Sequence, residues 1–379
     1  MATEMTTTKN DSPSLQYRDD GDAVYDKLVD VIEGVVSPVV IVVGLTGNTV
    51  GAATLLRVAG LRCRGIGHLL VAICVADAIF LASLLPMWAG RRYGRRYDLH
   101  RRDGWCELLT LTTMSSNFLS TWFTVALGAE RYFAVRYCFR HALAVDGREN
   151  PEPMARTSCG PTRTRVAIIA LTVLAIVVFV NMVVNYGVTT DNDDVQYCVP
   201  LQHAVDAMRV LSNIDLVFNV IAPNLVIAGL YAALGVRLAT WHCHRGRLSP
   251  PRPAGHEDDR AESMIEIRLT RTAVLLSAVV MLLSVPSQAA RTAYVVAGIF
   301  RLPVPARLGG MSVQLVVREL FYASFTVPFF VVVASHGRIR RFIVLSVQLA
   351  LDSVWKGFQV ARCCCSSQAS SMTRQNAAV

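Results

Sequence analysis

Charged residues are scarce in this chain: Asp, Glu, Lys and Arg make up 17% of its 379 residues, whereas 53% are hydrophobic. Soluble domains carry about a quarter charged residues, so the composition favours lipid over water as the solvent. Lysine is especially rare, with Lys9, Lys27 and Lys356 as its only occurrences. The N-terminal segment is polar and acidic and lacks the apolar stretch of a cleaved signal peptide. We therefore expect the first apolar segment to act as the targeting signal.

Motifs of catalysis and of transport are also lacking. The apolar segments contain no paired histidines, no Gly-x-Ser-x-Gly and no carboxylate-lined metal motif, so an intramembrane enzyme is the least favoured function. The two halves of the sequence show no similarity to each other, whereas transporters often contain internal repeats. A transporter or channel remains the main alternative to a receptor.

Seven apolar segments are each long enough to cross about 30 Å of hydrocarbon at about 1.5 Å per helical residue. They predict an all-α fold, a seven-transmembrane helical bundle with an outer arm at 1–34, a membrane domain at 35–337, a short amphipathic interfacial helix at 338–350 and a tail at 351–379. The segments are 35–56, 67–88, 108–135, 166–188, 210–234, 272–297 and 313–334.

The distribution of basic residues predicts an extracellular N-terminus in the plasma membrane. With that orientation, 22 of the 37 Lys and Arg residues lie in cytoplasmic segments, as the positive-inside rule requires. The arginine-rich interval 91–102 runs against the rule because it would lie outside.

The cysteines support the same orientation. Of ten cysteines, only Cys106 and Cys198 fall in the predicted outer segments, where the compartment is oxidising, so one intramolecular disulfide is available to them. Asn10 begins an Asn-Asp-Ser tripeptide in the outer arm and is a candidate glycosylation site.

Polar motifs occur at intervals along these segments, and their order and spacing are specific. From Cys106 to Arg131 is 25 residues, or about 37 Å of helix, which places the two residues at opposite membrane faces. The sequence resembles rhodopsin-like (class A) G-protein-coupled receptors and, within that family, the invertebrate FMRFamide-like neuropeptide receptors, through Phe179-Val-Asn181 and the absence of an amine anchor. The wider resemblance rests on Gly47-Asn48, the segment 70–77 ending in Asp77, Trp105-Cys106, Glu130-Arg131-Tyr132, Pro223, Tyr231 and Pro286.

The resemblance implies a receptor that binds an extracellular peptide and activates a heterotrimeric G protein, with arrestin, receptor kinases and membrane lipids as further partners and no nucleic acid. We expect Arg131 to pair with Glu130 and Glu266 at rest, although an arginine at this depth can also simply extend its head group to the interface. The residues expected to carry activation and coupling are Glu130, Arg131, Tyr132, Tyr231, Glu266, Pro286 and Pro328.

Asp77 lies in the middle of the second segment, where an unpaired carboxylate is costly. It is either a neutral, hydrogen-bonded structural acid or part of a polar cluster with Asn48, Ser120 and Ser324. In the receptors that the sequence resembles, such a cluster often holds an allosteric sodium ion. Sodium is therefore the one possible cofactor, and no other metal is expected.

The chain departs from the family pattern at three places. The fourth segment lacks a Trp, Ser284 stands two residues before Pro286 where a Trp is usual, and the last motif reads Val327-Pro328-Phe-Phe-Val331 in place of Asn-Pro-x-x-Tyr. These departures leave altered activation or a non-signalling decoy receptor open.

A ligand pocket is expected between the outer halves of the third and sixth segments, unless these residues only pack. Thr113 stands where receptors for amines carry an Asp, which disfavours an amine. Because the seventh segment has no lysine, retinal cannot form a Schiff base there. The expected pocket residues are Thr113, Met114, Asn117, Gln288 and Arg291.

The segment after the last span alternates basic and apolar residues, which is typical of a helix lying on an anionic membrane surface. The cysteines that follow it, Cys363, Cys364 and Cys365, are candidate palmitoylation sites, with metal binding as the alternative.

Overall fold

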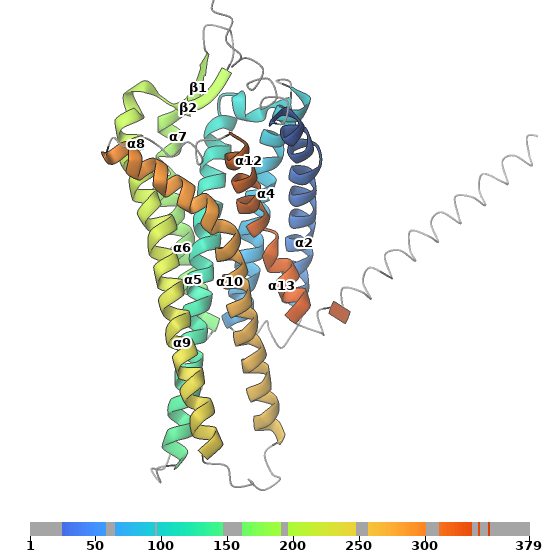
Figure 1. The fold of residues 1–379 in the computed structure, drawn as a ribbon, viewed down its shortest axis with the longest axis vertical. Helices are drawn as coiled ribbons and strands as arrows, with labels where there is room; N and C mark the ends of the chain where they lie inside the picture. The colour runs from blue at the N-terminus through green and yellow to red at the C-terminus, as the bar shows by residue number, and fades with distance from the viewer. Residues whose placement is uncertain are drawn as a thin grey trace, which may run out of the picture.

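The computed structural model describes residues 25–57, 65–94, 97–146, 161–190, 196–247, 257–300 and 311–335, together with residues 340, 341 and 348. Most of this part of the chain is helical, and the long helices lie side by side along the long axis of the molecule (Figure 1). The elements are η1 (Ile32–Val36), α2 (Ser37–Arg57), α4 (Gly65–Tyr93), η3 (Leu99–Arg101), α5 (Trp105–Asp146), α6 (Pro161–Phe179), α7 (Met182–Asn185), β1 (Tyr186–Thr190), β2 (Gln196–Pro200), η4 (Gln202–Ala204), α8 (Val205–Asp215), η5 (Leu216–Ile221), α9 (Ala222–Arg247), α10 (Glu257–Phe300), α12 (Met311–Ser324) and α13 (Val327–Ser335).

Several of these helices have the length and composition of membrane spans, and they indicate a membrane-embedded protein. α12 and α13 together would form one further span, bent by 44° at the break between them. Within the described residues, the five single helices that qualify are Tyr25–Arg57, Gly65–Tyr93, Thr162–Asn185, Val210–Val236 and Leu269–Ala297.

The predicted span 108–135 is helical but is not among those that qualify by composition. α5 is rich in Ser, Thr and Asn between Thr110 and Thr124, which makes it more polar than its neighbours. It runs through the middle of the bundle and packs against α4, α6, α9 and α10 (Figure 1). The hydroxyls of α5 can therefore face other helices and avoid contact with lipid.

Several predicted segment boundaries differ from the structure, and two of them concern the outer arm and the fourth segment. The first helix is already formed at Tyr25, within the segment 1–34 that was predicted to be an arm. The fourth segment was predicted to continue to Val188, but β1 begins at Tyr186. Both errors have one cause: hydropathy reports the apolar part of a segment, and a short apolar run does not distinguish a helix end from a strand.

A small β-hairpin covers one end of the bundle (Figure 1). The prediction of an all-α fold missed this hairpin. β1 and β2 pair antiparallel, with Val188 opposite Cys198.

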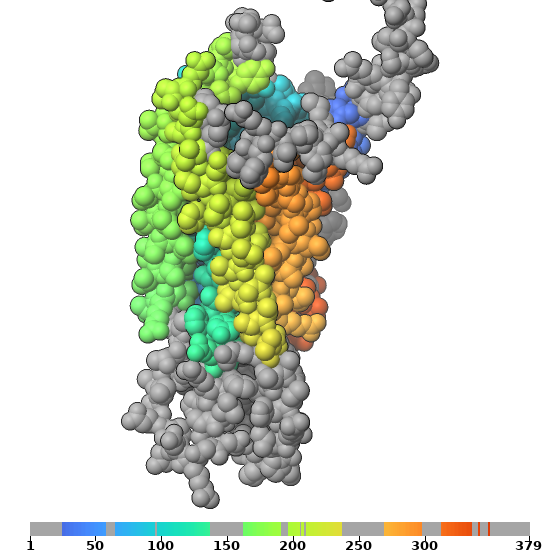
Figure 2. Space-filling view, turned by 60° about the vertical axis from the view of Figure 1, so that its left-hand side comes forward, coloured from blue at the N-terminus to red at the C-terminus, as the bar shows by residue number. Residues whose placement is uncertain are grey.

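The outward surface of the bundle is apolar where water would demand polar residues. Figure 2 shows a face built from α6, α9 and α10. On these helices Val177, Leu225 and Leu282 are 63%, 68% and 73% exposed, respectively. Such a surface is stable against lipid tails, so the polar groups must find their partners inside the bundle.

Glycines on α2 allow it to lie close to its neighbours. A Cβ at Gly47 would lie 2.7 Å from the ring of Phe329 on α13, whereas a Cβ at Gly51 would meet Phe329 and Cys74 at 3.5 Å, an ordinary contact. Small residues at such crossings let helix backbones approach in membranes. Gly47 therefore sets the distance between α2 and α13.

We predict that Gly47→Ala destabilises the protein by about 1–3 kcal/mol, the usual cost of overpacking, because the Phe329 ring must move. Gly51→Ala is the matched control, since it adds the same methyl group to the same helix at a site with room. The measurement is the thermal unfolding midpoint of each purified variant in detergent. Equal midpoints for the two variants would contradict the close contact at Gly47.

Candidate functional site

A disulfide attaches the β-hairpin to the N-terminal end of α5. Cys106, in the first turn of α5, is bonded to Cys198 of β2, with the two Cα atoms 5.6 Å apart. Cys106 is fully buried, and Thr110 Oγ1 lies 3.8 Å from Cys198 Sγ one turn further along α5. The pairing expected from the sequence is thus present in the structure.

A polar cluster joins the loop before α5 to the same hairpin. Arg101 of η3 donates to Asp98 at 2.7 Å and lies over the Tyr197 ring of β2, with 5.6 Å between the guanidinium carbon and the ring centroid. Burial lowers the pKa of His100 below its ordinary value of 6.5, with the positive charges of Arg101 and Arg91 adding to the effect and Asp98 opposing it. The neutral form of His100 therefore fits this fold.

Glu130 and Arg131, in the second half of α5, form a buried ion pair. Arg131 donates from Nε and from Nη2 to the two carboxylate oxygens of Glu130, each at 2.6 Å, and only 2% of Arg131 is exposed. A bidentate contact of this kind compensates both charges in a region that excludes water. Tyr132 packs edge-on against Phe133.

Tyr231 links α9 to α10 on the inner side of the bundle. Its hydroxyl donates to the carbonyl oxygen of Ala273 at 3.0 Å and lies 2.7 Å from Ser277 Oγ. Gly128 on α5 faces the same hydroxyl, because a Cβ built on it would lie 3.5 Å from the Tyr231 oxygen. Three helices therefore meet at one polar contact.

Asp77 is buried in the middle of α4, with 1% of its surface exposed. Ser120 of α5 donates to its Oδ1 at 2.5 Å. The second oxygen, Oδ2, has no hydrogen-bond partner in the described part of the chain. Of the polar cluster expected here, Ser324 instead donates to the carbonyl of Phe321, so its hydroxyl proton is not directed at Asp77.

Asn48 bridges α2 to the break between α12 and α13. Its Nδ2 donates to the carbonyl oxygen of Phe325 at 2.7 Å, not to Asp77 as the sequence suggested. Two hydrogen-bonded turns form the break. In the first, the N–H of Phe325 donates to the carbonyl oxygen of Tyr322, and in the second, the N–H of Thr326 donates to that of Ala323. Pro328, one residue into α13, has no N–H to continue the α-helical pattern, which explains why the span bends there.

The residues expected to form a ligand pocket are mostly bonded to their neighbours. Thr113 Oγ1 lies 2.8 Å from Ser83 Oγ of α4, and Met114 packs against an apolar cluster around Phe118. Gln288 accepts a hydrogen bond from Asn224 at 2.6 Å, and Arg291 donates to Asp215 at 2.5 Å. These two contacts join α10 to the α8–η5–α9 segment. Pro286 lies within continuous α10, between Gln288 and Ser277, the residue that Tyr231 of α9 contacts.

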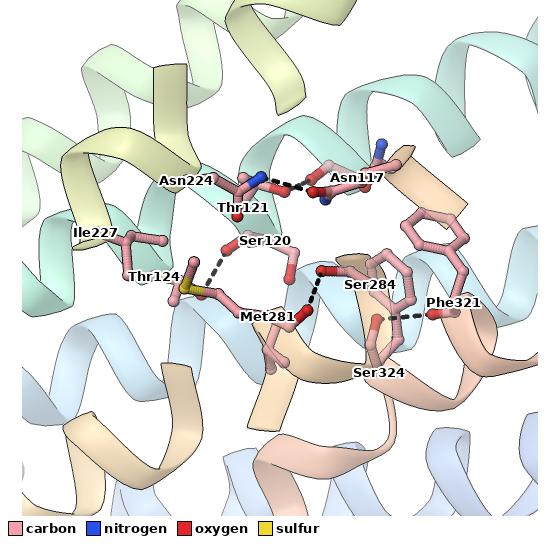
Figure 3. Close-up of a pocket in the computed structure, with 13 residues that line it drawn as sticks. Asn117, Ser120, Thr121, Thr124, Asn224, Ile227, Met281, Ser284, Phe321 and Ser324 are labelled. Carbon is pink, nitrogen blue, oxygen red and sulfur yellow. Dashed lines mark hydrogen bonds between the residues drawn. The ribbon is translucent and has the colours of Figure 1, made fainter. Parts of the chain in front are cut away.

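A cavity of about 30 Å³ lies where α5, α9, α10 and α12 meet (Figure 3). Asn117, which the sequence assigned to the ligand pocket, and Ser120 and Ser324, which it assigned to the Asp77 cluster, all face this cavity. Ser284 also lines it, in the place where the family pattern has a Trp. The remaining lining residues are Thr121, Thr124, Asn224, Ile227, Val280, Met281, Gln288, Phe321 and Phe325.

A second buried ionic cluster is centred on Glu33, near the C-terminal end of α4. Glu33, within the first helix, accepts from Arg91 at 3.0 Å and from Arg318 at 2.7 Å, and its carbonyl accepts from Trp88 Nε1. Arg318 also donates to Glu319 at 3.0 Å. Three helices are thereby joined. Adjacency in the sequence favours the contact of Arg318 with Glu319, whereas only the fold brings Glu33 to Arg91 and Arg318.

Two of the arginines that conflict with the positive-inside rule have carboxylate partners in the structure. Arg91 binds Glu33, and Arg92 binds Asp30 at 3.0 Å.

Some expected site residues lie outside the described part of the structure. These are Asn10, the side chain of Glu266, the interfacial helix 338–350 apart from residues 340, 341 and 348, and Cys363, Cys364 and Cys365. The expected contact between Arg131 and Glu266 stays a prediction for the same reason.

Comparison with known proteins adds no relationship to this geometry. No protein-family model matches the chain, and no curated protein matches it. The function must therefore be inferred from the disulfide, the Glu130–Arg131 pair and the polar contacts between the helices.

We predict that Tyr231 and Ser277 contribute to stability through one shared contact. Tyr231→Phe and Ser277→Ala should each lower the free energy of unfolding by about 0.5–1.5 kcal/mol, the net value of a hydrogen bond. The double variant should lose less than the sum of the two, because the shared bond can be lost only once. Unfolding midpoints of the four proteins measure this coupling, and strict additivity would show that the two hydroxyls act independently.

We also predict a pH dependence from His100. Because the pKa of His100 is lowered in the folded state, the unfolded chain takes up a proton first as the pH falls through 6.5. Stability should therefore fall below pH 6.5 and level off once the folded protein is protonated too. Unfolding midpoints of the wild type and of His100→Gln, measured between pH 8 and about 5, should diverge at the acidic end. Parallel curves would contradict the burial of His100.

Proposed function

We propose that this chain is a seven-span receptor of the G-protein-coupled, rhodopsin-like kind, with its N-terminus outside the plasma membrane. The observation that carries the proposal is the buried Glu130–Arg131 pair on α5, 25 residues along the chain from Cys106 of the Cys106–Cys198 disulfide. α5 would be the span that composition alone does not identify. The resemblance in motif order supports this function over an enzyme or a transporter.

The ion pair is suited to hold a resting state. Breaking a buried pair leaves a charge without compensation, which costs about 3–5 kcal/mol. Arg131 will therefore stay on Glu130 until a partner at the inner face offers it other acceptors. A heterotrimeric G protein would be that partner, with arrestin and receptor kinases acting later on the same face.

The contacts of α10 supply the path by which an outer ligand would reach Arg131. Arg291 and Gln288 tie the outer half of α10 to Asp215 and Asn224, and Tyr231 ties its inner half to α9 through Ser277. Displacing the outer contacts would favour a different position of the inner half. The pair Glu130–Arg131 would then be exposed to the G protein.

The outer charges favour a peptide ligand over a cationic amine. Arg291 is paired with Asp215, yet 35% of its side chain is exposed, so it can exchange Asp215 for a carboxylate or amide oxygen of a ligand. Thr113 offers no counter-ion for an amine and is already bonded to Ser83. A neuropeptide, by the resemblance an amidated one, fits these chemical properties.

Asp77 is also suited to a sodium ion. Its Oδ2 lacks a partner within the described ranges and its Oδ1 is held by Ser120, so Asp77 and Ser120 would supply the ligands. Sodium would neutralise the carboxylate and favour the resting state.

The proposal predicts a G-protein response that depends on Arg131. In cells expressing the chain, a library of amidated peptides should contain agonists, and Arg131→Ala should abolish the response because the inner contact is lost. Arg57→Ala, which removes an exposed arginine at the inner end of α2, is the matched control and should respond as the wild type does. Glu130→Gln should raise basal signalling, because it weakens the hold on Arg131.

Surface expression is measured with a tag at the N-terminus, in intact cells, which also tests the orientation. Well-expressed surface protein without any basal or peptide-dependent signal would contradict the proposal and favour a decoy receptor. A response that persists in Arg131→Ala would show that signalling does not depend on the Glu130–Arg131 pair.

A further inference from the structure

Two tyrosines lie together at the surface where α4 ends. Gly94 follows the helix with a φ of +91°, in the left-handed region that favours glycine. The N–H of Tyr97 donates to the carbonyl oxygen of Gly94 at 3.1 Å, so the chain turns back and brings Tyr97 beside Tyr93. The ring centroids are 6.1 Å apart and the ring planes meet at 72°. Because Tyr93 and Tyr97 are 63% and 56% exposed, the two rings form an open aromatic corner.

This end of the bundle has the composition of a membrane interface. α4 ends at Tyr93 and α5 begins at Trp105, so both residues lie at the same end of the two helices. Trp105 and Leu108 are exposed on one side of α5, three residues apart. Tryptophan and tyrosine are enriched at the level of the lipid head groups, and an exposed leucine below them is stable against lipid tails. The tyrosine corner therefore lies at the level of the head groups.

The charge beside the tyrosines is positive. Residues 91–103 include six arginines and two aspartates. Arg92 directly precedes Tyr93, and its side chain is 43% exposed, while that of its partner Asp30 is 77% exposed. An ion pair as exposed as this one contributes little to stability. Arg92 can therefore exchange Asp30 for the phosphate of a head group, to which a guanidinium binds well.

We propose that Arg92, Tyr93 and Tyr97 form a binding site for the head group of a membrane phosphatidylcholine. Quaternary ammonium groups bind against the faces of aromatic rings, so the choline would lie in the corner of the two tyrosines. Arg92 would bind the adjacent phosphate, and the acyl chains would follow the apolar surface that begins at Leu108. Arginine alone favours any phospholipid, whereas the exposed tyrosine rings favour one with choline. This inference does not depend on the proposed function.

Lipid titration of the delipidated full-length protein in detergent, read by native mass spectrometry, tests the site. The probes are dioctanoyl phosphatidylcholine and dioctanoyl phosphatidylglycerol, which share the phosphate and the acyl chains and differ in the choline. Tyr93→Leu combined with Tyr97→Leu should weaken binding of the first phosphatidylcholine several-fold and leave phosphatidylglycerol unchanged. Tyr93→Phe combined with Tyr97→Phe keeps both rings and is the matched control, which should bind as the wild type does. Arg92→Gln should weaken both lipids alike.

Equal affinities of the wild type and the leucine variant for phosphatidylcholine would overturn the proposal. An equal loss of both lipids would also overturn it, because the site would then recognise phosphate without choline. Phosphocholine lacking acyl chains that binds as tightly as the lipid would show a site for a soluble ligand, with the same consequence.

A second measurement does not require the leucine variant to fold. In lipid nanodiscs, a nitroxide on the choline head group should quench Trp105 fluorescence more strongly than a nitroxide at the end of the acyl chain. The Trp105 signal is the difference between the wild type and Trp105→Phe. Stronger quenching by the acyl-chain probe, or no quenching by either, would show that this end of α5 does not lie among the head groups and would overturn the proposal.

Discussion

The hydrocarbon interior requires every polar group on α5 to find a partner inside the protein, and the rest of the bundle depends on this requirement. Ser120 and Thr113 of α5 meet this requirement through α4, at Asp77 and Ser83, whereas Ser116 and Thr124 bond to carbonyl oxygens of α5 itself. These contacts with α4 account for the position of α5 inside the bundle. The apolar helices α6, α9 and α10 can occupy the outer face because they carry little that needs a partner (Figure 2).

Along α5 the three polar regions differ in how completely they are satisfied. The Glu130–Arg131 pair is bidentate and closed, whereas Asp77 has one oxygen bonded to Ser120 and one without a partner within the described ranges. The cavity beside Ser120 is lined by hydroxyl and amide side chains. The polar groups at the centre of the bundle are thus less completely paired than the Glu130–Arg131 pair.

At the outer end, charge pairs join helices that are distant in sequence. Glu33 forms salt bridges with Arg91 and Arg318, and Arg291 forms one with Asp215. Salt bridges therefore link the helices on two sides of this end of the bundle. Under the proposed function, a ligand that enters between them would compete with these partners. Such competition would favour ligands with hydrogen-bonding groups of their own over purely apolar ones.

The sequence by itself determined the apolar helices, the pairing of Cys106 with Cys198, the contact of Arg131 with Glu130 and the polar position of Asp77, because each follows from composition, adjacency or elimination along the chain. The partners of Asn48, Gln288 and Arg291, the hairpin at Tyr186, the Glu33 cluster and the cavity at Ser284 were decided only by the tertiary structure. Their contacts join residues far apart in sequence, such as Asn48 and Phe325, and depend on how helices rotate and cross. Hydropathy reports how apolar a segment is, but it carries no information on which side of a helix meets which neighbour.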